Sequence, residues 1–201
     1  METFTKELQD KTSPEKAVDR LKQGNKRFVA KELTERDFLS QVDQTSGGQF
    51  PFAAILSCID SRVPAEIVFD QGIGDVFNVR VAGNIVNEDV LGSLEYSCKV
   101  AGSKVIVVMG HTKCGAVTAA CNHVELGNIT HLLGKIQPAV KSVMKGAPDP
   151  DTIEKVAVKN IELSIERIRD ESPILAELES NGEIKIVGAI YDVASGVACF
   201  F

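Results

Sequence analysis

The sequence lacks the features that mark membrane and nucleic-acid-binding proteins. No stretch approaches eighteen uninterrupted apolar residues, so we expect no membrane span. The chain carries 22 Lys and Arg against 28 Asp and Glu, a formal net charge of −6, and its basic residues form no run. An acidic chain without a basic face argues against a nucleic-acid partner.

Cysteines and targeting signals are also scarce. Five cysteines among 201 residues form no disulfide framework, and the odd number leaves at least one of them unpaired. The first eight residues, METFTKEL, lack the cationic start and the apolar core of a signal peptide. We therefore expect a reducing, cytoplasmic setting. The length and the 44% hydrophobic content predict one globular domain over residues 1–201.

The clearest pattern in the chain is an unbroken apolar run at Lys104–Met109. Because polar and apolar residues do not alternate there, the run is typical of a strand covered on both faces, as in a parallel sheet between helices. Segments with helical periodicity separate the apolar runs, and one helix is expected over Thr130–Lys145. We predict an α/β protein with four further strands: Phe52–Ser57, Val76–Val81, Glu183–Tyr191 and, as an edge strand or a subunit contact, Val197–Phe201.

Residues 1–48 differ from the α/β core predicted at 49–201. They are polar and mostly helical by pattern, with Pro14 at the first position of a helix and apolar residues following at a spacing near 3.6. Such an arm has too little apolar surface to fold alone. We expect it to lie across the main body or across a partner subunit.

Side chains capable of binding a metal follow two of the predicted strands. Cys58 comes after the first strand, and His111 and Cys114 come after Lys104–Met109. The carboxyl ends of strands in an open parallel sheet are where ligands bind, so both segments can meet in one crevice. Two cysteines and one histidine provide three ligands, which is the number that a catalytic zinc site uses when its fourth position is left for water. We predict a Zn²⁺ site at Cys58, His111 and Cys114, and we interpret Cys98, Cys121 and Cys199 as small core residues.

Asp60 and Arg62 lie just beyond Cys58 and two positions apart. In an extended backbone their side chains leave from the same face and can form a charge-assisted pair. By itself this would be a surface ion pair worth about 0 to 1 kcal/mol. Beside a zinc ligand, Arg62 would keep Asp60 ionised, so that Asp60 either accepts a hydrogen bond from zinc-bound hydroxide or, in a closed state, binds the metal itself.

Three motifs resemble the signature of the β-class carbonic anhydrases: Cys-x-Asp-Ser-Arg at 58–62, Val-Arg-x-Ala-Gly-Asn at 79–84 and Gly-His-x-x-Cys-Gly at 110–115. The resemblance implies a mostly parallel sheet with an antiparallel strand, an N-terminal helical arm that embraces a second subunit, and active sites at the dimer interface. It puts zinc on Cys58, His111 and Cys114 and makes Asp60 and Arg62 the catalytic pair. The reaction that it implies is the reversible hydration of carbon dioxide to bicarbonate and a proton by zinc-bound hydroxide.

Three further residues resemble the plant-like branch of that family. Gln49 lies nine residues before Cys58, where this branch has a glutamine that donates a hydrogen bond to bicarbonate, and Phe77 and Tyr96 match positions that line its carbon dioxide pocket. Taken singly, each residue also fits loop polarity or core packing. The allosteric branch uses a tryptophan in a bicarbonate pocket, and this chain has no Trp. We therefore expect the open, water-ligated site to dominate near neutral pH.

Other functions remain open for the same residues. A hydrolase of carbonyl sulfide or carbon disulfide would share the zinc ligands and differ in the shape of its pocket. A non-catalytic, zinc-stabilised binding module would tolerate replacement of Asp60 or Arg62. A redox role for Cys58 or Cys114 is weaker, because neither belongs to a Cys-x-x-Cys pair. The motifs favour self-association but do not distinguish a homodimer from a homotetramer.

Overall fold

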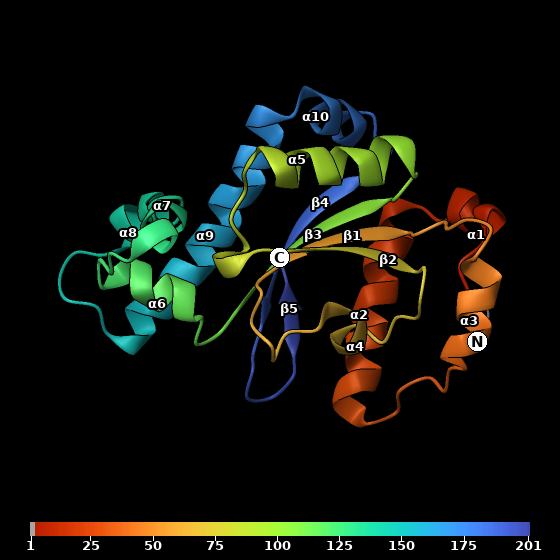
Figure 1. Ribbon diagram of the computed structural model, residues 1–201, viewed down its shortest axis with the longest axis horizontal. Coiled ribbons are helices and arrows are strands. Elements are labelled where there is room, and N and C mark those ends of the chain that lie inside the picture. Colours follow the sequence, from red (N-terminus) through yellow and green to blue (C-terminus); the bar gives the residue numbers. More distant parts are fainter. Residues whose placement is uncertain (1–2) are drawn as a thin grey trace.

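A five-stranded sheet forms the centre of the protein. The computed structural model describes residues 3–201 and orders the strands β2-β1-β3-β4-β5 (Figure 1). The first four strands run parallel, and β5 runs antiparallel to β4. This arrangement confirms the predicted α/β class and the antiparallel edge strand. The strands are β1 (Ala53–Ser57), β2 (Val76–Arg80), β3 (Val105–His111), β4 (Lys185–Tyr191) and β5 (Ala198–Phe200).

Helices cover both faces of this sheet. In chain order they are α1 (Lys6–Lys11), α2 (Pro14–Ala30), α3 (Phe38–Thr45), α4 (Ala65–Val68), the 3-10 turn η1 (Ala82–Asn84), α5 (Glu88–Glu95), the π turn η2 (Tyr96–Val100), α6 (Gly115–Cys121), α7 (Gly127–Gly134), α8 (Gln137–Val143), α9 (Pro150–Glu171) and α10 (Pro173–Ser180). One face packs on α2 and α4 and the other on α5, α9 and α10, while α6, α7 and α8 form a separate cluster with α9 (Figure 1). Within residues 3–201, no helix has the length and apolar character needed to cross a membrane.

The two central strands show why an unbroken apolar run predicts this fold. Every residue of β1 and β3 is buried. Ile55 and Val107 face the helices on one side of the sheet, and Leu56 and Val108 face those on the other. Because both faces lie against helices, neither strand needs a polar side, and the prediction at Lys104–Met109 is confirmed. The predicted strand at the C-terminus is confirmed as well, since β5 pairs with β4 at the sheet edge.

The single helix predicted over Thr130–Lys145 is wrong. The segment forms two helices, because α7 ends at Gly134 and α8 begins at Gln137. Pro138 stands in the first turn of α8. A proline in a continuous helix would lack its backbone donor and clash with the carbonyl four residues earlier, here that of Gly134, so the chain ends one helix and starts another.

The N-terminal arm lies across its own sheet, one of the two arrangements that the sequence left open. Ala17 and Leu21 of α2 are fully buried, and Val18 is nearly so. All three belong to the apolar cluster that contains Phe52 and Val107. The apolar stripe of α2 therefore completes one layer of the core.

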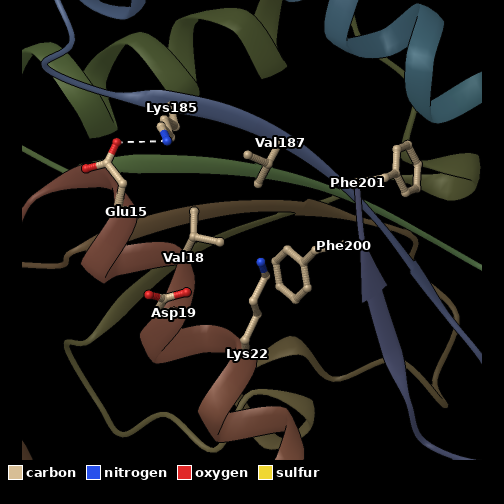
Figure 2. A pocket seen from close by; sticks show the side chains of 8 residues that line it. All are labelled: Glu15, Val18, Asp19, Lys22, Lys185, Val187, Phe200 and Phe201. Atoms are coloured by element: carbon tan, nitrogen blue, oxygen red, sulfur yellow. Dashed lines mark ion pairs between the residues drawn. The ribbon is translucent and has the colours of Figure 1, made fainter.

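Figure 2 shows the open edge of this contact, where α2 meets β4 and β5 around a hollow of about 370 Å³. Glu15 forms a 2.8 Å ion pair with Lys185 of β4. Lys22 places its ammonium group 5.5 Å from the centre of the Phe200 ring. The hollow therefore lies at the junction of arm and sheet, and both lysines that line it already have partners.

Asp70 joins the segment after α2 to the segment after α4. Its carboxylate is almost fully buried and accepts hydrogen bonds from Arg27, from the hydroxyl and backbone N–H of Thr34, and from Arg36. Arg36 also donates to the carbonyl oxygen of Asp70. Burial raises the pKa of Asp70, but the hydrogen bonds from Arg36, Arg27 and Thr34 outweigh burial and hold the pKa below its usual range.

Replacing Asp70 should destabilise the fold in a pH-dependent manner. Asp70→Asn keeps the size of the side chain but leaves Arg36, which is nearly buried, without its counter-charge, so we expect a loss of about 3 to 5 kcal/mol at pH 7. Because the folded pKa is depressed, this stability is present above the unfolded value of about 3.9 and is lost as the pH falls through the folded value.

Urea unfolding between pH 7 and pH 2.5 tests this expectation. The gap between wild type and Asp70→Asn should narrow below about pH 4. Asp10→Asn is the control, because Asp10 forms an exposed pair with Lys6 that is worth about 0 to 1 kcal/mol. A gap that keeps its size down to pH 2.5 would contradict the role given to the ionised carboxylate.

Candidate active site

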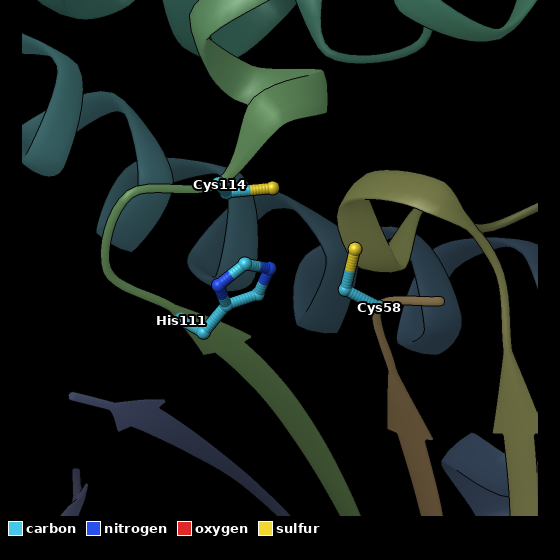
Figure 3. A group of neighbouring side chains, drawn as sticks. All are labelled: Cys58, His111 and Cys114. Carbon is cyan, nitrogen blue, oxygen red and sulfur yellow. The ribbon is translucent and has the colours of Figure 1, made fainter. Parts of the chain in front are cut away.

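The ends of β1 and β3 bring three potential metal ligands together. Cys58 directly follows β1, His111 is the last residue of β3, and Cys114 stands immediately before α6. Because β1 and β3 are parallel neighbours with Ser57 beside Met109, their carboxyl ends lie at the same edge of the sheet. The two sulfurs and one ring nitrogen lie within 4.8 Å of one another, and Figure 3 shows the three side chains converging.

The environment of His111 fits a metal. Its Nδ1 lies 2.9 Å from the carbonyl oxygen of Thr112, which accepts the ring proton and leaves Nε2 with a free lone pair. This Nε2 is buried and has no hydrogen-bond partner. Tetrahedral zinc with Zn–S bonds near 2.3 Å separates two sulfurs by about 3.8 Å, so ligands within 4.8 Å need only a small contraction. The cluster therefore suits an ion the size of zinc.

The cysteines divide into two chemical groups. A hydrogen bond from the Cys114 thiol lowers the pKa of Cys58, and the same interaction raises the pKa of Cys114. Burial alone raises the pKa of Cys121 and raises that of Cys98 to about 12, so these two are neutral core residues as predicted. The prediction for Cys199 is wrong: it is exposed, because the middle residue of the short edge strand β5 faces outward.

Asp60 and Arg62 form the predicted pair beside the cluster. Arg62 donates to Asp60 Oδ1 from Nε at 2.9 Å and to Oδ2 from a terminal nitrogen at 2.7 Å, and its backbone N–H donates to Oδ1 at 2.9 Å. The hydrogen bond from the Arg62 side chain holds the pKa of Asp60 well below its usual range. Asp60 Oδ2 lies 3.8 Å from His111 Nε2. The pair thus reaches the rim of the cluster with an ionised, oriented carboxylate.

Two further residues, Arg80 and Glu154, fix the ligand-bearing segments. Arg80, at the end of β2, donates to the carbonyl oxygens of Cys58 at 3.1 Å and Asp60 at 2.7 Å. Glu154 of α9 accepts the backbone N–H of Lys113 at 2.8 Å, where Lys113 adopts a φ of 55°. Arg80 belongs to the Val-Arg-x-Ala-Gly-Asn motif, so the motif signalled it. Glu154 follows its partner by 41 positions and carries no such signal.

Gly83 of η1 touches the cluster through its backbone. Its N–H donates to Cys58 Sγ at 3.3 Å. The residue adopts φ 67° and ψ 20°, and a Cβ built on it would lie 2.7 Å from Ile136 Cδ1. Both the left-handed conformation and the close approach favour glycine at this position.

The three predicted substrate contacts lie apart from this cluster within one chain. Gln49 is exposed and precedes the amino end of β1, whereas Cys58 follows its carboxyl end. Phe77 pairs with Ala54 in the sheet register, three residues or about 10 Å before the carboxyl end of β2. Its ring packs edge to face against the ring of Tyr96, with the two ring centres 6.2 Å apart, and Tyr96 is 54% exposed. Phe77 and Tyr96 therefore meet each other, but neither they nor Gln49 join the cluster.

Together the fold and the cluster define an α/β protein with a Cys₂His metal-binding constellation at its strand ends. A family model for carbonic anhydrase matches residues 53–198. Carbonic anhydrase 2 of Mycobacterium tuberculosis is 36% identical over 193 residues, which cover 93% of this chain and 92% of that protein. The carbonic anhydrase of Mycolicibacterium smegmatis is 32% identical over 191 residues, with 92% of each chain covered.

Solved structures of β-carbonic anhydrases share this fold. The β-carbonic anhydrase CcaA superposes with a TM-score of 0.75 at 25% identity, covering 92% of this chain and 94% of that one. A chain from a study of two tetrameric β-carbonic anhydrases of Sordaria macrospora superposes with a TM-score of 0.72 at 22% identity, covering 81% and 89%. This chain belongs to the β-carbonic anhydrase family and is an enzyme. Hydration of carbon dioxide is the general reaction of that family.

Replacing Gly83 should destabilise the protein at the site. Gly83→Ala forces a side chain into a left-handed conformation and against Ile136, so we expect a loss of about 1 to 3 kcal/mol. Gly92→Ala is the control, because Gly92 lies in α5 with open space around its Cα, and the change should be neutral or stabilising by about 0.5 to 1 kcal/mol. Thermal unfolding measures both, and equal melting temperatures for the two variants would refute the constraint at Gly83.

Proposed function

We propose that this chain catalyses the reversible hydration of carbon dioxide, with Zn²⁺ held by Cys58, His111 and Cys114. The observation that carries the proposal is the buried, unpartnered Nε2 of His111, which faces two cysteine sulfurs next to an ionised carboxylate. When bound there, zinc would supply a Lewis acid that lowers the pKa of water toward ~7 and so provides hydroxide at neutral pH. The remaining steps belong to residues of the chain.

Asp60 directs the nucleophile. Because Arg62 keeps it ionised, Asp60 is available as an acceptor at neutral pH, and a hydrogen bond to it fixes the direction in which the nucleophile attacks. Three hydrogen bonds from Arg62 also hold the carboxylate in place at the rim. This supports the open state of the plant-like branch, in which Asp60 does not bind the metal, as does the absence of Trp.

The substrate contacts point to a site shared between two copies. Gln49, Phe77 and Tyr96 lie toward the amino ends of the strands, away from Cys58 of the same chain. We infer that in a homodimer they serve the partner subunit, where Gln49 donates to bicarbonate while Phe77 and Tyr96 line an apolar pocket for carbon dioxide. Most residues of the edge strand β2 are only half-buried in the single chain, so this strand is available for contact with a partner subunit.

The N-terminal arm supplies further surface for self-association. Leu39 of α3 is 82% exposed, and Phe38 and Val42 of the same helix are more than half exposed. An apolar helix face of this kind is typical of a protein interface. A second copy of the chain is the occupant that fits the family, and the Sordaria macrospora study describes tetrameric enzymes. We propose a homodimer or homotetramer in which α3 contacts the next subunit.

The cysteine chemistry supports a reducing, cytoplasmic location. All five cysteines are free. Oxidation of Cys58 with Cys114 would remove two of the three proposed ligands, because only deprotonated, reduced sulfur binds zinc.

Stopped-flow hydration of carbon dioxide near pH 7 and pH 8.5 tests the proposal. We expect fast hydration at both pH values with zinc-loaded protein and its loss after treatment with a chelator. Asp60→Asn should lower kcat/KM about 100-fold, because the nucleophile loses its orientation. Asp151→Asn, in the exposed first turn of α9, is the control and should leave the rate unchanged.

Other outcomes would favour the other functions. Hydration at pH 8.5 alone would mean that Asp60 blocks the metal near neutrality. Higher efficiency on carbonyl sulfide or carbon disulfide than on carbon dioxide would make the protein a hydrolase of those substrates. Bound zinc without turnover of any of these substrates would favour the zinc-stabilised binding module.

A charge on α3 should dissociate the assembly. Leu39→Glu places a carboxylate on the exposed apolar face, so we expect the wild-type dimer or larger species to shift to a monomer of 21.7 kDa, with loss of hydration as the shared sites separate. Leu126→Glu provides the matched control, because Leu126 is 64% exposed next to α7 on the other side of the molecule (Figure 1). Sedimentation velocity measures the mass, and a monomeric wild type would disprove the shared site.

A further inference from the structure

Helix α9 holds the turn that touches Cys58. Asn160 Nδ2 donates to the carbonyl oxygen of Gly83 at 2.8 Å, and the N–H of Gly83 donates to Cys58 Sγ at 3.3 Å. Asn160 is 3% exposed, and Gly83 and Cys58 are buried as well. A side chain of α9 is thus connected to the sulfur through a single residue of η1.

Gly83 has no means of its own to hold this geometry. Glycine has wide conformational freedom, and a Cβ at this position would lie 2.7 Å from Ile136 Cδ1, so a larger residue here would be disfavoured. One peptide group carries the N–H that donates to Cys58, and the next carries the carbonyl oxygen that accepts the hydrogen bond from Asn160. The two groups meet at the Cα of Gly83, so only its φ and ψ torsions lie between them. An anchor on one group therefore restricts the orientation of the other.

We propose that Asn160 is a positioning residue that aims the Gly83 N–H at Cys58 and thereby limits how strongly this sulfur donates electrons to the bound metal. The inference rests on the proposed zinc site. A hydrogen bond to a thiolate withdraws electron density from sulfur, so the metal keeps more of its positive charge. The dry surroundings strengthen the hydrogen bond relative to one in water.

The same helix offers two matched controls. Ser164 lies one turn after Asn160 and contacts the same turn of chain, but its hydroxyl reaches the carbonyl oxygen of Asn84 at 3.5 Å and does not touch Gly83. Ile168 is fully buried in α9 and packs in the apolar cluster with Ile165. Ser164→Ala tests the loss of a hydrogen bond to η1, and Ile168→Val tests a general loss of stability.

The experiment compares Asn160→Ala with both controls after loading with cobalt(II) or zinc. We expect the sulfur-to-cobalt charge-transfer band of Asn160→Ala to move to lower energy, because the sulfur becomes a stronger donor. The zinc dissociation constant, measured by chelator competition, should rise about 10-fold or more, because the loss of orientation at Cys58 outweighs the stronger donation by its sulfur. The pH midpoint of carbon dioxide hydration should move upward, since the metal becomes a weaker acid. Ser164→Ala and Ile168→Val should keep the wild-type band and midpoint.

The outcomes separate this inference from the proposed function. A folded Asn160→Ala variant with the wild-type band, zinc affinity and pH midpoint would overturn the role of Asn160 while the zinc site stands. A wild-type chain that binds neither metal would overturn both. Should Asn160→Ala fail to fold, Asn160→Ser takes its place, because its shorter side chain keeps a polar group while withdrawing the donor from Gly83; the same shifts are expected.

Discussion

The in-register parallel pairing of β1 with β3 is the constraint on which the site depends. It sets Ser57 beside Met109, so Cys58 and the end of β3 emerge together at one edge of the sheet. A slip of one residue would turn every side chain of a strand to the opposite face. Two apolar clusters oppose such a slip, because Ile55 and Leu56 each fit helices on their own side. Core packing thus fixes the geometry of the ligands.

The site also separates two kinds of chemistry. The ligand atoms lie in a dry interior, where His111 is fully buried, while Arg62 stands half exposed at the rim. Arg80 joins the two parts, since it binds the backbone of both Cys58 and Asp60. Burial shields the three potential ligands from bulk water, while the carboxylate of Asp60 remains ionised and partly exposed.

Local patterns predicted much of this arrangement. Apolar runs identified the strands, and ligand-type residues directly after β1 and β3 identified the cluster at Cys58, His111 and Cys114. The contacts of Glu154 and Asn160 were not predictable, because each residue is an ordinary polar position on a helix and its partner lies 41 or 77 positions away. The outward orientation of Cys199 was missed because an apolar end segment does not reveal which side of an edge strand is covered.

With a metal bound as proposed, the unpartnered Nε2 of His111 would tie the folding of the chain to the supply of metal. A buried acceptor without a partner costs about 1 to 3 kcal/mol, and an ion that fills the site removes this cost. Any ion that binds only the folded chain adds stability with its free concentration, about 4 kcal/mol at a thousandfold excess over Kd. Through this linkage the amount of folded protein follows metal availability, so a shortage of metal would lower the abundance of the protein as well as its activity.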